Sequence, residues 1–131
     1  MRYLLDTNTI IGLLRYDRSP LARRARHEQH DDLATSSIVV QELFFGAFKS
    51  ARPGHNLSIF DSLAFPIIDF DRDDARRAGL VRAELTARGT PIGPYDVLIA
   101  GHALARNLTL VTHNTREFSR VPGLRIEDWE A

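Results

Sequence analysis

The chain has 131 residues, of which 44% are hydrophobic, so it can bury about two-thirds of the surface of its unfolded chain, and we expect residues 1–131 to form a single domain. Its 17 basic and 17 acidic residues cancel, so it lacks the net positive charge of many nucleic-acid-binding proteins. It has no cysteine, which excludes disulfides, thiolate metal sites and a cysteine nucleophile; any metal must be bound by oxygen or imidazole.

The N-terminal segment meets a charge too early for a signal peptide, because Asp6 follows only a short apolar run. No apolar run approaches the roughly 20 residues that span a bilayer. We therefore expect a cytoplasmic protein without membrane contact.

Strand and helix patterns alternate along the chain, with Gly, Pro and capping residues between them. In chain order, the pattern predicts strand 2–6, helix 10–14, helix 20–30, strand 33–35, helix 38–50, helix 53–65, strand 66–70, helix 73–87, helix 97–105, strand 108–112 and an edge strand over 124–129. Strands separated by helices predict an α/β fold with a central, mostly parallel sheet of four to five strands and helices on both faces.

The predicted helix over 38–50 is apolar on nearly every side, which is wider than the stripe that a helix needs to face one core. Its phenylalanines Phe44, Phe45 and Phe48 therefore have two interpretations. They are either buried within the domain or form a groove for a helix of a partner protein.

Four carboxylates lie in or beside apolar segments, where burial of an unpaired charge is expensive. They are Asp6, Glu42, Asp96 and Glu117. Ligands bind at the carboxyl ends of strands in open parallel sheets, and Asp6 ends the first strand while Thr112 ends the fourth. This placement predicts that the acids converge on a shared cation.

Each acid also has an ordinary structural interpretation. Asp6 and Asp96 each stand where a side chain caps the following helix, since Asp is a favoured N-cap residue. Glu42 could pair with a basic side chain. Glu117 lies in a short polar turn that is typical of an exposed surface, and Asn114 could replace or support it as a neutral oxygen ligand.

Converging carboxylates suit Mg²⁺ or Mn²⁺, which prefer oxygen ligands and retain waters that phosphate oxygens can replace. The corresponding chemistry is hydrolysis of a phosphate ester. One ion lowers the pKa of a bound water, and a second, roughly 4 Å away, stabilises the departing oxyanion.

Local sequences around these acids carry a family resemblance over essentially the whole chain. They are residues 5–8, 40–47, 89–103, 110–118 and 121–129. Together and in this order they resemble the PIN-domain nucleases, and more narrowly the VapC toxins of bacterial toxin-antitoxin pairs.

The resemblance implies a PIN-like fold in which Asp6, Glu42 and Asp96 are catalytic acids that bind the metal. It places the fourth acid in the turn from Asn114 to Glu117. Asn114 stands where many relatives carry Asp, so Glu117 is the expected fourth acid.

Four further residues are expected to support the site: Thr7, Asn8, Thr112 and Asn114. The Thr7 and Thr112 hydroxyls are candidates for contacts with ligands or substrate, and each also suits a local role as a cap or strand-end residue.

The resemblance further implies a Mg²⁺-dependent endoribonuclease, with Mn²⁺ as a substitute, that cleaves structured RNA. For many members the RNA is tRNA, and the most similar branch acts on initiator tRNA. The implied partners are a VapB-type antitoxin, whose tail crosses the active-site groove, and a second copy of the chain in a homodimer.

Two other functions fit an acidic pocket at the end of the first strand. A metal-dependent phosphohydrolase of the haloacid-dehalogenase type would carry a second Asp at the position of Asn8, which argues against it. A non-catalytic regulatory module of the receiver type needs a nearby lysine, and the sole lysine, Lys49, is poorly placed on the Glu42 helix.

Overall fold

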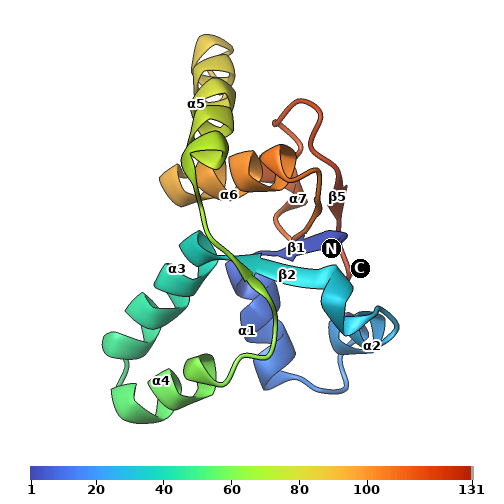
Figure 1. Cartoon of the computed structure of the whole chain (residues 1–131), viewed down its shortest axis with the longest axis vertical. Helices are drawn as coiled ribbons and strands as arrows, with labels where there is room; N and C mark the ends of the chain where they lie inside the picture. The colour runs from blue at the N-terminus through green and yellow to red at the C-terminus, as the bar shows by residue number, and fades with distance from the viewer. Residues whose placement is uncertain (131) are drawn as a thin grey trace.

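The computed structural model describes residues 1–130, in which five strands form one sheet flanked by helices (Figure 1). The strands are β1 (Tyr3–Leu5), β2 (Leu33–Ser36), β3 (Ile67–Ile68), β4 (Thr109–Val111) and β5 (Ile126–Glu127). The helices are α1 (Thr7–Arg15), α2 (Pro20–Arg26), the 3-10 turn η1 (His30–Asp32), α3 (Ser37–Phe48), α4 (Pro53–Asp61), α5 (Arg72–Ala87), α6 (Pro94–Ala105) and α7 (Thr115–Phe118).

The sheet order is β3-β2-β1-β4-β5, and every neighbouring pair is parallel. From β1 the chain passes through α1 and α2 to β2, and then through α3 and α4 to β3 at the edge of the sheet. It returns to β4, on the other side of β1, through α5 and α6. In Figure 1, α1 and α2 lie on one side of the sheet and α5 and α6 on the other. The α/β prediction, with a central parallel sheet covered on both faces, is confirmed.

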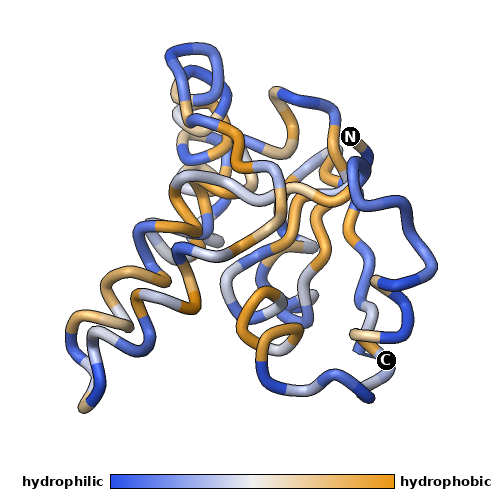
Figure 2. The backbone as a smooth tube through the Cα atoms, turned by 60° about the horizontal axis from the view of Figure 1, so that its bottom comes forward, coloured by the Kyte–Doolittle hydropathy of each residue, from blue (hydrophilic) through white to orange (hydrophobic). Residues whose placement is uncertain are grey.

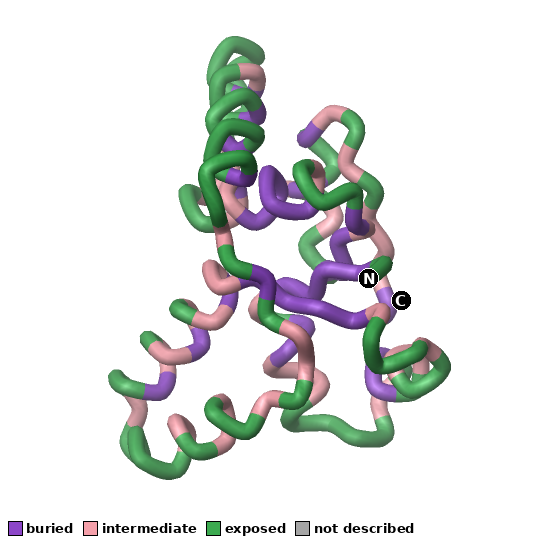
Figure 3. The backbone as a smooth tube through the Cα atoms, in the orientation of Figure 1, coloured by how far each residue is buried: buried purple, intermediate pink, exposed green. Residues whose placement is uncertain are grey.

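The central strands β1 and β4 form the core between the two helical layers. Leu4, Leu5 and Leu110 have no exposed surface. The strands at the centre of the molecule are coloured as hydrophobic in Figure 2, and the position of β1 is coloured as buried in Figure 3, whereas much of α5 is coloured as exposed. Strands covered on both faces need apolar side chains in both directions, which explains the continuous apolar runs in the sequence.

Three elements differ from their predicted limits. The helix expected over 20–30 ends at Arg26, because the chain turns through η1 before it enters β2. The helix expected over 53–65 ends at Asp61, since the chain must extend before Pro66 to reach β3. The turn that was expected to be polar and exposed is the short helix α7, whose Phe118 is buried.

Helices α3 and α4 extend away from the sheet as an arm (Figure 1). Phe45 and Phe48 on α3 are 62% and 67% exposed. Leu43 and Ala47, on the opposite side of the same helix, are buried. The broad apolar surface of α3 is therefore only half covered within residues 1–130. None of the helices in this range is long and apolar enough to cross a membrane.

Helices α5 and α6 cross at very close range. A Cβ atom added at Gly101 on α6 would lie 2.5 Å from the Ala78 Cα on α5, a distance that real structures do not allow. Gly79, on the neighbouring position of α5, has no atom within 4 Å of an added Cβ. The two glycines thus have opposite roles, although both lie inside helices.

We predict that Gly101→Ala lowers the free energy of unfolding by about 1–3 kcal/mol, because the helices must separate to admit the methyl group. Gly79→Ala should instead raise it by up to about 1 kcal/mol, since Ala is the better helix former. Urea unfolding of the two variants measures both changes. Equal effects of the two substitutions would contradict the close crossing.

Candidate active site

The four predicted acids come from four separate elements. Asp6 joins β1 to α1, Glu42 lies in the middle of α3, Asp96 lies in the first turn of α6 and Glu117 lies in α7. The charges of Glu117, Glu42 and Asp6 all act on Asp96 and raise its pKa. The fold therefore gathers the four carboxyl groups at one edge of the sheet.

Asp6 is nearly buried, with 8% of its surface exposed. Its Oδ1 accepts a hydrogen bond of 2.9 Å from the Thr9 amide, so it is the N-cap of α1. Its own amide donates to the Val111 carbonyl of β4 at 3.2 Å. The capping interpretation of Asp6 is confirmed, and the cap holds the carboxylate at the end of β1.

Glu42 has a buried oxygen, Oε1, that lacks a hydrogen-bond partner within residues 1–130, as does the Thr7 hydroxyl. Burial and the charge of Asp6 raise the pKa of Glu42, although the nearby Thr7 hydroxyl, short of hydrogen-bond geometry, lowers it in part. The alternative that Glu42 pairs with a basic side chain is wrong for the described chain, which contains no such ion pair. The Lys49 ammonium instead lies over the Phe45 ring.

Asp96 and Glu117 face each other across Gly93. A Cβ added at Gly93 would lie 3.0 Å from the Asp96 Oδ2 and 3.5 Å from the Glu117 Oε1. Burial, followed by the charge of Glu117, raises the pKa of Asp96 to about 7. Asp96 does not cap α6, because Gly93 holds the N-cap position and no side-chain cap is formed there.

Glu117 is held by neutral donors on both oxygens. The Gly93 amide donates to Oε1 at 2.5 Å, and the Asn114 Nδ2 donates to Oε2 at 2.7 Å. Burial alone would raise the pKa of Glu117, but these bonds, together with the Asp96 side chain and the charge of Arg120, outweigh it and lower the pKa below the usual range. Glu117 thus stays ionised beside Asp96.

The supporting residues have different positions. Asn114 orients Glu117, and the Thr112 hydroxyl accepts a bond of 3.0 Å from the Asn114 amide. Thr7 lies beside Glu42, whereas Asn8 is exposed and its side chain forms no hydrogen bond with residues 1–130. The sequence reasoning missed the Gly93 amide, whose only signal was its place in the loop before Asp96.

The residues present fit a hard divalent cation. Four carboxyl groups converge, one of them with an unpartnered oxygen, and burial together with the charges of the other three acids raises the pKa of Asp96. Their ligand atoms are still spread out: within residues 1–130, the single set of three that lies within 4.8 Å is His113, Asp128 and Glu130.

A cleft of about 260 Å³ runs from Glu42 between α1, α3 and α4. Arg15 lines it together with apolar residues such as Leu14, Ile59 and Phe60. An elongated ligand in this cleft would reach the acids from the apolar side of the arm.

Comparison with known proteins identifies the family. The family model described as the PIN domain matches residues 3–124. The chain belongs to the PIN-domain family. It is 43% identical over 132 residues to the tRNA(fMet)-specific endonuclease VapC of Salmonella typhimurium and 40% identical over 131 residues to the protein of that name from Shigella flexneri, with 98% of each chain covered. These relatives place this PIN-domain chain among the VapC proteins and confirm the resemblance found in its sequence.

Solved structures support the same assignment and the PIN-like fold. The chain matches the DNA-bound VapBC of Salmonella typhimurium with a TM-score of 0.92 at 42% identity, covering 98% of each chain. It matches VapBC-1 of nontypeable Haemophilus influenzae with a TM-score of 0.91 at 34% identity, covering 100% of each chain.

The raised pKa of Asp96 predicts how the stability of the metal-free protein depends on pH. Folded Asp96 keeps its proton up to about pH 7, whereas an unfolded Asp loses it near pH 4. Its contribution to stability is therefore complete below about pH 4 and is lost as the pH rises through about 7.

We expect Asp96→Asn to stabilise the protein in chelator at about pH 8 relative to the wild type, and to do so less at about pH 5. Urea unfolding of both proteins at both pH values measures this difference in the free energy of unfolding. Groups that titrate alike in the variant and the wild type cancel from the difference. A difference that does not change with pH would show that the carboxyl of Asp96 is not crowded by its neighbours.

Proposed function

We propose that the protein is the toxin of a type II toxin-antitoxin system and acts as a Mg²⁺-dependent endoribonuclease. The observation that carries the proposal is the group of four carboxylates, one with an unpartnered buried oxygen and one with its pKa raised to about 7. Such a group is costly without a cation and serves hydrolysis of phosphodiesters with one. Relatives named as VapC ribonucleases support the activity.

Asp6, Glu42, Asp96 and Glu117 would hold Mg²⁺, or Mn²⁺ in its place. When bound, the cation lowers the pKa of its water and neutralises phosphate charge. The chain's own residues set the geometry: the Thr9 amide fixes Asp6, while the Gly93 amide and Asn114 fix Glu117. Without the cation the pKa of Asp96 lies at about 7, so binding of the cation would displace a proton from this carboxyl group and should weaken as the pH falls.

We propose structured RNA as the substrate, and initiator tRNA in particular. Two relatives that are 43% and 40% identical are named tRNA(fMet)-specific endonucleases. We also propose a VapB-type antitoxin as a partner, since matching structures are of VapBC complexes. The proposed assembly of the toxin itself is a homodimer, which rests on the family resemblance alone. The cleft beside Glu42 offers the antitoxin an apolar surface that ends at the acids, and Phe45 and Phe48 offer a second exposed apolar surface on the other side of α3.

The activity is tested by incubating the antitoxin-free protein with tRNA, with Mg²⁺ and with chelator. We expect discrete fragments that require Mg²⁺, and Asp6→Asn should cut the rate by roughly a hundredfold or more, because a ligand of the proposed cation is lost. Asp61→Asn, an exposed acid at the end of α4, is the matched control and should cleave normally.

Intact RNA after incubation with folded wild type in Mg²⁺ would refute the nuclease. Equal loss of cleavage in Asp6→Asn and Asp61→Asn would show that the cleavage does not depend on the four carboxylates. Mapping the ends of the fragments identifies the RNA and the bond that is cut.

The partner surface is tested by titrating the cognate antitoxin against Phe48→Ser. Removal of a large exposed aromatic ring at an interface should weaken binding by roughly thirtyfold, while RNA cleavage by the free toxin should not change. Tyr16→Ser removes an aromatic ring of similar exposure at the end of α1 and serves as the control. Unchanged affinity of Phe48→Ser would place the antitoxin elsewhere.

A further inference from the structure

A buried polar network joins α6 to the start of α3. His102 on α6 has no exposed surface, and its Nδ1 lies 2.8 Å from the Ser36 Oγ. Its Nε2 lies 3.3 Å from the Asp74 Oδ2 on α5, a contact that falls short of hydrogen-bond alignment. Ser36 and Asp74 are also fully buried, so this Ser, His and Asp set cannot reach a substrate.

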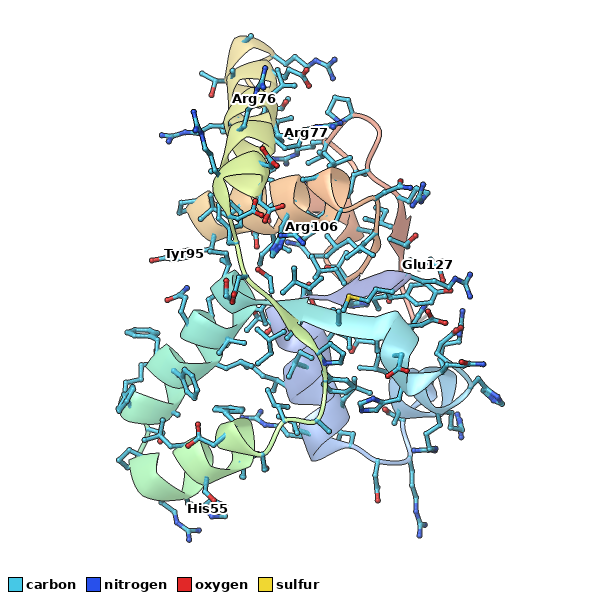
Figure 4. All side chains as sticks on the ribbon, in the orientation of Figure 1. His55, Arg76, Arg77, Tyr95, Arg106 and Glu127 are labelled. Carbon is cyan, nitrogen blue, oxygen red and sulfur yellow. The ribbon has the colours of Figure 1, made fainter. Side chains whose placement is uncertain are left out.

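Asp74 is neutralised from the other side by Arg106. The guanidinium donates from Nε to Oδ1 and from Nη2 to Oδ2, both at 3.0 Å. Arg106 leaves the end of α6 and lies beside the start of α5 (Figure 4). Burial lowers the pKa of His102 and keeps the imidazole neutral, although the charges of Asp74, Asp71 and Asp69 act in the opposite direction.

The protonation of the network follows from its partners. A carboxylate only accepts, so the contact with Asp74 favours a proton on Nε2 of His102. Nδ1 is then an acceptor, and the Ser36 hydroxyl donates to it. The same hydroxyl oxygen accepts the Ile38 amide at 3.0 Å, which makes Ser36 the N-cap of α3. The Ser36 hydroxyl therefore caps α3 and also links α3 to α6 by a hydrogen bond.

The two joined helices carry two of the four acids. Glu42 lies six residues after Ser36 on α3, and Asp96 lies six residues before His102 on α6. Each acid is therefore about 9 Å along its helix from the bond between them. Because α3 extends from the sheet as an arm, its orientation depends on how its first turn is attached (Figure 1).

We infer that His102 is a positioning residue, whose bond to the Ser36 hydroxyl sets the direction of α3 against α6 and thereby the separation of Glu42 and Asp96. The inference rests on the proposed nuclease activity for its kinetic consequence, but the bond itself is independent of that activity. A shift of about 1 Å at a catalytic group costs roughly a hundredfold in rate.

Two substitutions of His102 each keep one of its two contacts and remove the other. In His102→Asn, the side-chain oxygen takes the place of Nδ1 and still accepts from Ser36, while the contact with Asp74 is lost. In His102→Gln, the amide reaches towards Asp74 and leaves Ser36 without an acceptor. Val81→Ala opens a cavity beneath α5, seven residues along the helix from Asp74, and is the control for a general loss of stability.

We expect His102→Gln and Ser36→Ala to lower kcat on RNA by about tenfold to a hundredfold with KM little changed, and His102→Asn to restore most of kcat. Val81→Ala should keep kcat at temperatures where circular dichroism shows it folded. Hydrogen exchange of the Ile38 amide should be faster in His102→Gln and Ser36→Ala than in His102→Asn and the wild type.

Equal kcat and equal Ile38 exchange in His102→Asn and His102→Gln would overturn the inference, as would a loss of kcat in Val81→Ala that matches the loss in His102→Gln. If the wild type fails to cleave RNA, the proposed function fails. In that case, the rate of hydrogen exchange of the Ile38 amide in the His102 variants alone shows whether the bond from His102 to Ser36 holds the first turn of α3.

Discussion

The repulsion among four carboxylates at one edge of a parallel sheet is the constraint on which the rest of the structure depends. Parallel strands deliver their following loops to the same edge, so Asp6 after β1 and Glu117 after β4 meet acids from α3 and α6. Burial, followed by the charges of Glu117, Glu42 and Asp6, raises the pKa of Asp96 to about 7. The fold tolerates the electrostatic cost of gathering the acids because its stability comes from the apolar core between the strands and the helical layers.

Neutral donors hold the acids in place without cancelling their charge. Amides of Thr9 and Gly93 and the Asn114 side chain each bond a carboxylate oxygen, which orients the oxygens and leaves the negative charge available to a cation. Two arginines are paired away from the site: Arg106 binds Asp74, and Arg24 binds Glu28 and lies over the Trp129 ring. The charge of Arg120 acts on Glu117, but within residues 1–130 no arginine forms an ion pair with any of the four acids.

Much of the fold could be predicted from the sequence, because its signals are local. The alternation of strands and helices, the cap at Asp6 and the broad apolar surface of α3 each follow from a few neighbouring residues. The bonds of Gly93 to Glu117 and of His102 to Ser36 join positions 24 and 66 residues apart, and no local pattern encodes such pairs. The early ends of α2 and α4 were missed because the path to the next strand, rather than helix propensity, ends them.

Titration of Mn²⁺ into the RNA-free protein by calorimetry tests the central claim, that the acids form one cation site, most directly. Asp96→Asn should abolish or strongly weaken the binding, whereas Asp128→Asn, which alters the rival set of His113, Asp128 and Glu130, should bind as the wild type does. Normal binding in Asp96→Asn and loss of binding in Asp128→Asn would contradict the account and would place the cation at His113, Asp128 and Glu130.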